Sequence, residues 1–429
     1  MKGVVFISSI LPFPLDAAKK VTVSGILRYL CERYGAEHVT YILLSGVEGG
    51  ESLGKEMPCK LLTLKKPGAR TQVWNTLWFV LIRRAKSIQE SVLYSAKLQR
   101  ELLATIAKLD PELVVCDTLR TGQFLETTKR PEGQYVLHMD DLFSVRYRRM
   151  IENLRRFPQV KLDTVRDFAK FVPSLFRALI KARPVQERVL RLEQGLVEKR
   201  EQGCVKWFDT VLLVNEKEAS SLRRKTGRAS IQTIKPLLRG PRKGMRRDYK
   251  GEATFVFLGQ LDYAPNLLSI TRFISTQMDH IIKKMPGVRL RIIGRGAPTN
   301  DLLGLASRYK GVISIEGFVE DLDAVFSTAC AMLVPLLSGS GVKLKALEAF
   351  SRGIPVVSTD LGVEGIPVTN SVDCIVENDF DRYPEAMVAL LDTNHNLRIS
   401  RKAYELYQRH YSKERVWQEY DHIFKRTSL

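Results

Sequence analysis

Residues Ser338–Thr359 read SGSGVKLKALEAFSRGIPVVST and form the most informative stretch of this 429-residue chain. A loop of small residues runs into a short amphipathic segment that carries Lys345 and Glu348. The segment ends at Gly353, and a short apolar run, Ile354–Val357, follows it. Loop, helix and strand in this order are typical of a ligand site at the carboxyl end of a parallel strand. The helix N-terminus favours an anionic ligand because its first N–H groups lack backbone partners.

The rest of the chain repeats the same alternation of short β-branched runs and helical periodicity, which predicts parallel sheets and an α/β fold. A chain of this length exceeds the usual size of one domain. We therefore expect two Rossmann-like, doubly wound domains that face a cleft. The predicted boundaries are residues 1–230 for the first domain, 231–250 for a basic linker and 251–405 for the second domain. The second domain's predicted series runs from strand Thr254–Leu258 to strand Ile354–Ser358, with a helix at 342–352 before the last strand.

Composition narrows the class of protein. Six scattered cysteines without a CxxC pair indicate free thiols in a reducing compartment and no zinc site. Met1–Pro14 predicts a buried first strand rather than a signal peptide, and the longest uncharged stretch contains proline and glycine, which excludes a membrane span. We expect a cytoplasmic protein.

The net charge of +20 is concentrated in two regions, Arg146–Arg200 and Ile231–Lys250. Such a field attracts nucleic acid, anionic lipid headgroups or phosphorylated substrates, or it serves only as a solvated surface. No nucleic-acid-binding motif accompanies it, so nucleic acid is not an expected partner. The segment Trp74–Arg84 (WNTLWFVLIRR) predicts either docking on the inner face of an anionic membrane or a buried core helix.

Strand-end loops of the second domain contain glycines that let backbone N–H groups approach a ligand. Asp321 is predicted to cap the helix that follows it. Lys345 is interpreted either as the cation that meets a diphosphate or as a surface lysine. Glu348 is interpreted either as a partner for ribose hydroxyls or as an i, i+3 ion pair with Lys345.

These segments closely resemble glycosyltransferase family 4. The matching stretches are Gly339–Thr359 with Asp360–Gly365 after it, Phe257–Asn266, Ile292–Gly296, Glu316–Asp321 and Tyr411–Arg415. The resemblance implies a two-domain, retaining, nucleotide-sugar-dependent enzyme of the GT-B fold. It also implies that residues 406–429 form a C-terminal helix that crosses back to the first domain. Leu11–Asp16, Cys116–Gln123 and Asp140–Tyr147 fit more loosely and suggest a subgroup associated with polysaccharide assembly.

The resemblance implies a donor site for a nucleotide-diphosphate sugar, with UDP-sugar favoured over GDP-sugar, and no cofactor or metal. Its implied members are Gly259, Gly294, Arg295, Gly317, Phe318, Gly339, Ser340, Gly341, Val342, Leu344, Lys345 and Glu348. The implied catalytic residues are Lys345, Ser340, Asp140 and Asp141. The acceptor would be a saccharide or a lipid-linked saccharide, bound by the first domain.

Several positions depart from the family pattern. Ser340 stands where many relatives carry a glutamate, and Gln260 and Asp262 stand in the region of a basic pair. Asp140-Asp141 occupies the place of a His-Asp pair, with His138 two positions earlier. Lys19 and Lys20 follow two alanines where a glycine pair is usual. The expected function is therefore glycosyl transfer in cell-surface polysaccharide or glycolipid assembly. The alternatives are a sugar-nucleotide epimerase or hydrolase on the same fold and a non-catalytic nucleotide or polyanion binder.

Overall fold

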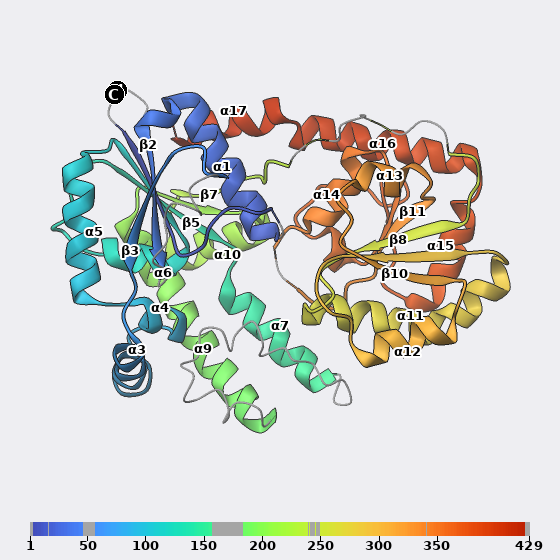
Figure 1. The fold of residues 1–429 in the computed structure, drawn as a ribbon, viewed down its shortest axis with the longest axis horizontal. Helices are drawn as coiled ribbons and strands as arrows, with labels where there is room; N and C mark the ends of the chain where they lie inside the picture. The colour runs from blue at the N-terminus through green and yellow to red at the C-terminus, as the bar shows by residue number, and fades with distance from the viewer. Residues whose placement is uncertain are drawn as a thin grey trace. The chain divides into compact units, whose positions relative to one another are not determined.

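The computed structural model describes residues 3–15, 17–45, 56–156, 183–238, 240, 245, 249–339 and 341–424. The chain divides into two compact units. The first contains the described residues of 1–155, 165–237 and 417–429, and the second contains those of 156–164 and 238–416. Each unit is built around one parallel sheet with helices packed against it (Figure 1).

The sheet of the first unit has seven strands in the order β3-β2-β1-β4-β5-β6-β7. The strands are β1 (Val4–Ser8), β2 (Val39–Ser45), β3 (Lys60–Lys65), β4 (Leu113–Asp117), β5 (Gln134–Asp140), β6 (Thr210–Leu213) and β7 (Ile231–Thr233). All neighbouring pairs are parallel; Val5, for example, is in register with Thr40 and Val114. The chain order reverses between β1 and β4, and in open α/β sheets ligands bind at the carboxyl ends of the strands near such a switch point.

The second sheet has six strands in the order β10-β9-β8-β11-β12-β13, again all parallel. They are β8 (Thr254–Leu258), β9 (Arg289–Ile293), β10 (Ile313–Gly317), β11 (Ala331–Val334), β12 (Val356–Ser358) and β13 (Ile375–Val376). The strand order switches between β8 and β11, so the loops after these two strands diverge around a common point.

The helices of the first unit and its final helix are α1 (Ala18–Tyr34), α3 (Ala69–Asn75), α4 (Ile88–Leu93), α5 (Ala96–Leu109), α6 (Thr118–Gly122), α7 (Phe143–Arg156), α9 (Arg183–Cys204), α10 (Glu216–Thr226) and α17 (Lys413–Phe424). Those of the second unit are α11 (Ala264–Lys284), α12 (Asn300–Arg308), α13 (Leu322–Ser327), α14 (Leu344–Ser351), α15 (Tyr383–Ala389) and α16 (Thr393–Tyr411). Side-chain caps fix several starts. Thr299, Asp321 and Asp392 accept backbone N–H groups of α12, α13 and α16, which confirms the predicted Asp321 cap.

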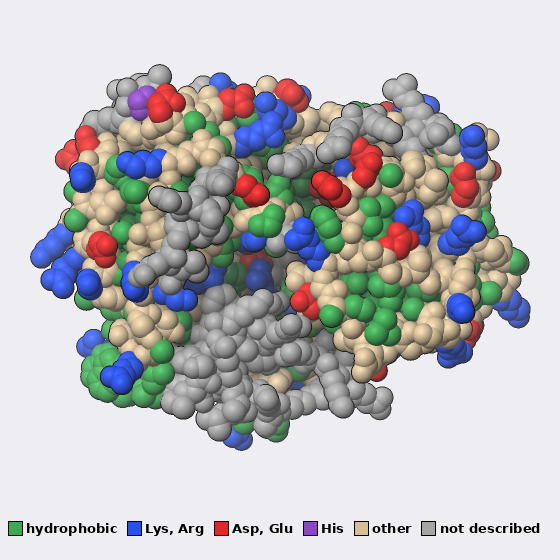
Figure 2. All heavy atoms as spheres, in the orientation of Figure 1, with side chains coloured by type: hydrophobic (Ala, Val, Ile, Leu, Met, Phe, Trp, Pro, Cys, Tyr) green, Lys and Arg blue, Asp and Glu red, His purple; other side chains and the backbone are tan. Residues whose placement is uncertain are grey.

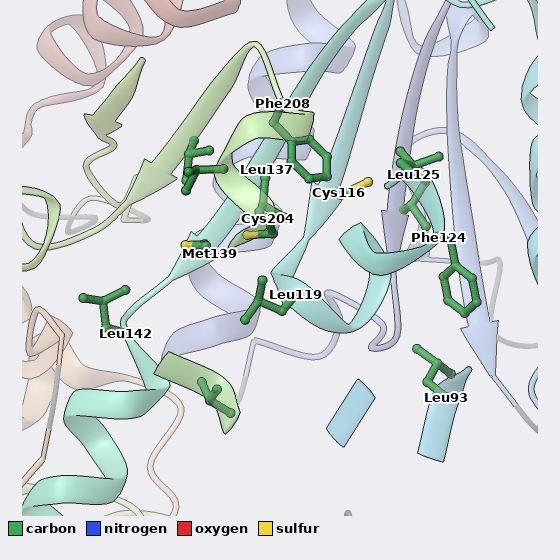
Figure 3. Close-up of a cluster of buried hydrophobic side chains, with 14 of the residues drawn as sticks. Leu93, Cys116, Leu119, Phe124, Leu125, Leu137, Met139, Leu142, Cys204 and Phe208 are labelled. Atoms are coloured by element: carbon green, nitrogen blue, oxygen red, sulfur yellow. The ribbon is translucent and has the colours of Figure 1, made fainter. Parts of the chain in front are cut away.

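The core of the first unit fills the space between its sheet and the helices. Figure 3 shows part of it, where Leu137 and Met139 of β5 lie among Leu119 of α6 and Cys204 of α9. These four side chains are almost completely buried. Burial of apolar surface on both faces explains why the strands read as continuous apolar runs in the sequence.

Helices α7 and α9 extend away from the sheet of the first unit and lie antiparallel, side by side (Figure 1). Two buried carboxylates on α9 hold its neighbours. Glu193 accepts from the N–H groups of Ile88 and Gln89 at the start of α4, and Glu201 accepts from the N–H of Ser144 in the first turn of α7. Burial raises the pKa of both carboxyl groups to about 8. Helix α9 thereby fixes where α4 and α7 begin.

The last helix, α17, belongs to the first unit. Asp421 accepts a hydrogen bond from the hydroxyl of Tyr29 at 2.7 Å and pairs with Arg33 at 2.6 Å, both on α1. Tyr420 is fully buried and packs edge-on against Tyr29. The chain therefore returns to its first unit after completing the second, as expected for this fold.

The predicted fold class is confirmed, with differences in detail. Helix α14 begins at Leu344 rather than at residue 342, and β12 begins at Val356 rather than at residue 354. Strand β7 lies inside the segment predicted as a linker, where it pairs with β6. Strands β3 and β13 were missed because β3 is half exposed and carries three lysine or threonine positions, and β13 has only two residues.

Candidate functional site

The loop at the beginning of the stretch Ser338–Thr359 forms the turn from β11 into α14. Gly339 and Gly341 have φ angles of 123° and 67°, in the left-handed region that favours glycine. The Lys343 ammonium donates to the carbonyl of Gly341 at 2.5 Å, which closes the turn. Helix α14 follows directly, so Val342 lies in the loop and Leu344 is the first helical residue, both half-buried. Ser340, the position that departs from the family pattern, lies outside the described residues.

Lys345 is the second residue of α14 and points toward β8. Its ammonium donates to the side-chain carbonyl of Asn266 at 2.8 Å and lies 4.7 Å from the ring centre of Phe257. Burial, together with the nearby Lys343 ammonium, lowers the pKa of Lys345 to about 7. The interpretation of Lys345 as a surface lysine is therefore wrong: the ammonium is held at the carboxyl end of β8.

Backbone hydrogen bonds link the loops after β8, β9 and β10. The N–H of Gly259 donates to Ile293 at 2.9 Å, and the N–H of Gly294 donates to Gly317 at 2.8 Å. A Cβ added to Gly259 would lie 2.9 Å from the Lys345 ammonium, and one added to Gly294 would lie 1.8 Å from the carbonyl oxygen of Gly259. These glycines are needed because the three loops and the lysine approach so closely.

Arg295 and Phe318 form a flat surface beside these loops. The guanidinium carbon of Arg295 lies 4.0 Å from the ring centre of Phe318, within the range of a cation–π contact. The Phe318 side chain is 56% exposed, which is unusual for a large aromatic residue in this unit. The two residues come from the loops after β9 and β10, so the structure brings these predicted neighbours together.

Glu348 forms its ion pair with a different residue from the one that the sequence suggested. Its carboxylate pairs with Arg352 at 2.5 Å, and Arg352 also pairs with Asp323 at 2.6 Å. The predicted i, i+3 pair with Lys345 is therefore wrong. Burial raises the pKa of Glu348, although Arg352 opposes the rise. The carboxyl group is fixed on α14 by Arg352, three residues beyond Lys345.

In the first unit, the two predicted aspartates have different surroundings. Asp141 is almost fully buried and holds the Arg146 guanidinium through both carboxylate oxygens at 2.7 Å. Asp140 instead ends β5 with a φ of 72°, and its carboxylate lies 3.5 Å from the Lys19 ammonium. A non-glycine residue in this region stores strain, which is common at functional sites.

Asp117 belongs to the same polar cluster and was not among the predicted site residues, although the segment Cys116–Gln123 was noted. It ends β4, is fully buried, and contacts Ser8 at 2.8 Å, Lys19 at 2.5 Å and His138 at 3.2 Å. Burial alone would raise the pKa of Asp117, but Lys19 and His138 hold it well below its usual range. Thr118, which follows, has a φ of 69°. The signal in the sequence was an acid directly after a buried strand.

Neither unit offers evidence of a metal centre in its described part, because no group of three or more His, Cys, Asp or Glu side chains gathers there. Helices long and apolar enough to cross a membrane are likewise absent from the part of the chain that the structure describes.

Comparison with known proteins supports the assignment of the second unit. Residues 252–393 match the family model "Glycosyl transferases group 1". An uncharacterized 44.6 kDa protein in the cps region of Klebsiella pneumoniae is 28% identical over 186 residues, which cover 40% of this chain and 45% of that relative. The chain thus aligns with less than half of that curated relative.

Solved structures match the whole chain. TarM has a TM-score of 0.65 at 11% identity and covers 99% of both chains. HepE from Anabaena in complex with UDP has a TM-score of 0.62 at 11% identity and covers 98% of both chains. WaaG, a glycosyltransferase involved in lipopolysaccharide biosynthesis, has a TM-score of 0.59 at 12% identity and covers 99% of this chain and 100% of its own. Residues 252–393 therefore match the model of glycosyl transferases group 1, and the chain as a whole has the GT-B fold.

Proposed function

We propose that this protein is a retaining glycosyltransferase that moves a sugar from a nucleotide-diphosphate sugar to a saccharide or lipid-linked saccharide. The observation that carries the proposal is the Lys345 ammonium, held by Asn266 at the mouth of β8 within the group 1 domain. A buried cation beside a helix N-terminus suits a ligand with two phosphates. UDP-sugar is the favoured donor, because the HepE structures that resemble this chain were solved with UDP and with UDP-glucose; GDP-sugar is the alternative.

The proposed donor contacts follow the order of the loops. The nucleobase would lie against Arg295 and Phe318 and meet the backbone of Gly294 and Gly317. Glu348, kept in place by Arg352, would accept hydrogen bonds from the ribose hydroxyls. A third set of contacts would hold the diphosphate. Its members are the backbone of Gly259, Gly339, Ser340, Gly341 and Val342, and the first turn of α14 with Leu344 and Lys345.

The proposed reaction breaks the bond between the anomeric carbon and the diphosphate. The transition state has oxocarbenium character, as in glycoside hydrolysis, and the leaving diphosphate gains negative charge. The α14 N-terminus and Lys345 would stabilise that charge without a metal ion. The acceptor hydroxyl would be met in the first unit by Asp140, whose carboxylate shares Lys19 with Asp117. Asp141 is the less suitable candidate for this contact, because both of its carboxylate oxygens already accept hydrogen bonds from Arg146.

We further propose that the product belongs to a cell-surface polysaccharide or glycolipid. Support comes from the relative in the cps region and from the fold shared with WaaG. A lipid-linked acceptor would place the protein in the cytoplasm at the inner face of the cell membrane.

The affinity for a UDP-sugar is expected to fall as the pH rises through about 7. In the donor-free protein, burial and Lys343 hold the pKa of Lys345 at about 7, so the ammonium loses its proton above that pH. Because the phosphates of a nucleotide sugar stay ionised, a neutral amine binds them less well. The Kd, measured by calorimetry from about pH 6 to about pH 8.5, should rise by up to about tenfold per unit above pH 7. A Lys345→Met variant should lose this dependence; a flat profile in the unmodified protein would contradict it.

The reaction class is tested by turnover of a panel of UDP-sugars and GDP-sugars with and without saccharide acceptors. A transferase releases nucleoside diphosphate faster when an acceptor is present, and the NMR coupling of the product's anomeric proton shows whether the donor's configuration is retained. Equal turnover without acceptor would instead favour an epimerase or hydrolase. Donor binding without turnover would favour a non-catalytic nucleotide or polyanion binder.

A further inference from the structure

Four large apolar side chains are exposed together on the first unit. Trp74 is 65% exposed, Trp78 37%, Leu81 53% and Ile82 67%, and we call these four residues the tryptophan face. They lie on α3 and on the π-helix that continues it, Thr76–Ile82. The remaining exposed large hydrophobic residues of the described chain are scattered, whereas these four lie within nine positions. A contiguous exposed apolar patch marks an interaction site more often than single residues do.

The opposite side of the same segment is firmly anchored. The Asn75 side chain donates to the carbonyls of Ser91 at 3.1 Å and Tyr94 at 2.7 Å. Asn75, Thr76 and Val80 are buried. The buried-helix interpretation is therefore wrong for the tryptophan face, because the segment contacts the unit through its other side. The π-helix, a rare form that is frequent at functional sites, widens the turn that presents the face.

Positive charge surrounds the tryptophan face. No Asp or Glu occurs between Glu56 and Glu90, and this stretch contains seven lysines and arginines. Arg70, Arg83 and Arg84 are exposed. The Arg83 guanidinium carbon lies 5.6 Å from the ring centre of Trp78, which keeps the charge next to the apolar surface. Figure 2 shows this arrangement as hydrophobic side chains with blue ones beside them at the lower left, where Figure 1 places α3.

The basic region Arg146–Arg200 predicted from the sequence is partly neutralised by ion pairs. Residues 157–182 of this region lie outside the described residues. Of the described arginines, Arg155 and Arg191 pair with Glu187, and Arg200 pairs with Glu90 and Glu126. Around the tryptophan face, by contrast, exposed arginines lie directly beside exposed apolar side chains.

We propose that the tryptophan face docks this protein on an anionic lipid bilayer. Tryptophan rings prefer the headgroup level, and leucine and isoleucine bury in the acyl boundary below it. Arg70, Arg83 and Arg84 meet the anionic headgroups. An acidic protein partner would match the charge but would not need two stacked tryptophans at the tip of an anchored segment. Docking extends the proposed function by placing the enzyme where a lipid-linked acceptor lies, yet it involves none of the donor-site residues.

The test is sedimentation of the full chain with large unilamellar vesicles. One set is phosphatidylcholine alone, and the other contains about one third phosphatidylglycerol. The protein should bind the anionic vesicles at about 0.05 M salt and largely dissociate at about 0.5 M salt.

The variant Trp74→Ser/Trp78→Ser should lose at least about tenfold in partitioning. The variant Arg83→Gln/Arg84→Gln should lose about tenfold or more on anionic vesicles only. Leu303→Ser, a similarly exposed residue on α12 (44%), is the matched control and should bind as the unmodified chain.

Two outcomes would overturn the proposal. One is absence of binding to anionic vesicles at low salt. The other is a tryptophan variant that binds vesicles normally but abolishes self-association or binding to another protein, which would make the face a protein interface. The outcome is separable from the donor site. The tryptophan variant should keep the thermal shift given by a nucleotide sugar, and vesicle binding in a protein that no nucleotide sugar stabilises would contradict the proposed function alone.

Discussion

Replacement of Lys345 by alanine is expected to lower the rate of sugar transfer by about 100- to 1000-fold. The ammonium lies at the carboxyl end of β8, 2.8 Å from the Asn266 side chain, where the leaving diphosphate would develop charge. Removal of one preorganised donor to a developing anion typically has an effect of this size. The rate is measured as release of nucleoside diphosphate at saturating donor, so that loss of catalysis is distinguished from loss of affinity.

Two further variants make the Lys345 result interpretable. Lys345→Met removes the ammonium but keeps an unbranched apolar side chain of similar length, so it should be as slow as the alanine variant while remaining folded. Lys310→Ala removes an exposed lysine of the same unit and should be fully active. A methionine variant with an unchanged rate would remove Lys345 from the reaction.

Replacement of Gly294 by alanine is expected to destabilise the second unit by about 3 kcal/mol and to abolish donor binding. The new Cβ would lie 1.8 Å from the carbonyl oxygen of Gly259, so the backbone of one loop must move. That movement breaks the contact between the ends of β8 and β9, next to Lys345. Thermal unfolding measures the stability change, and calorimetry with a nucleotide sugar measures the loss of affinity.

Gly304→Ala is the matched control for this prediction. Gly304 lies within α12, and nothing lies within 4 Å of an added Cβ. Alanine in a helix interior is favoured over glycine by roughly 0.5–1 kcal/mol, so this variant should be slightly more stable and bind donor normally. If Gly294→Ala unfolds at the same temperature as the unmodified protein and binds donor equally well, the close approach of the two loops is not a feature of the protein in solution.

Much of the second unit could be predicted because the patterns that identify its strands and loops each lie within a short segment of sequence. Apolar runs ending in glycine identified β8, β9 and β10, and the loop-to-helix pattern placed Lys345 one turn into a helix predicted to begin at residue 342, two residues before α14 begins. The partner of Glu348 was wrong because helical spacing allows both Lys345 and Arg352 as neighbours. Tertiary structure decides between them: Asp323 of α13 fixes Arg352, whereas Lys345 turns toward Asn266.

The polar cluster of the first unit is not local and was therefore only partly predicted. Lys19 and Asp117 are far apart in sequence, and they meet because β4 lies next to β1 in the sheet. For the segment that carries the tryptophan face, the sequence left both membrane docking and a buried helix open, for a different reason. A π-helix changes which side chains share a face, so α-helical periodicity could not separate the buried Val80 from the exposed Trp78.

The most direct test of this account is a thermal-shift titration of the full chain with a panel of UDP-sugars and GDP-sugars, run in parallel on the unmodified protein and on Lys345→Met. A ligand that binds only the folded state adds about 2.7 kcal/mol to the free energy of unfolding at a hundredfold excess over Kd. The unfolding temperature rises as a result. We predict that at least one nucleotide sugar stabilises the unmodified protein and that the shift is much smaller in the variant. A cooperatively folded protein that no nucleotide sugar stabilises, or an equal shift in both proteins, would contradict the proposed donor site.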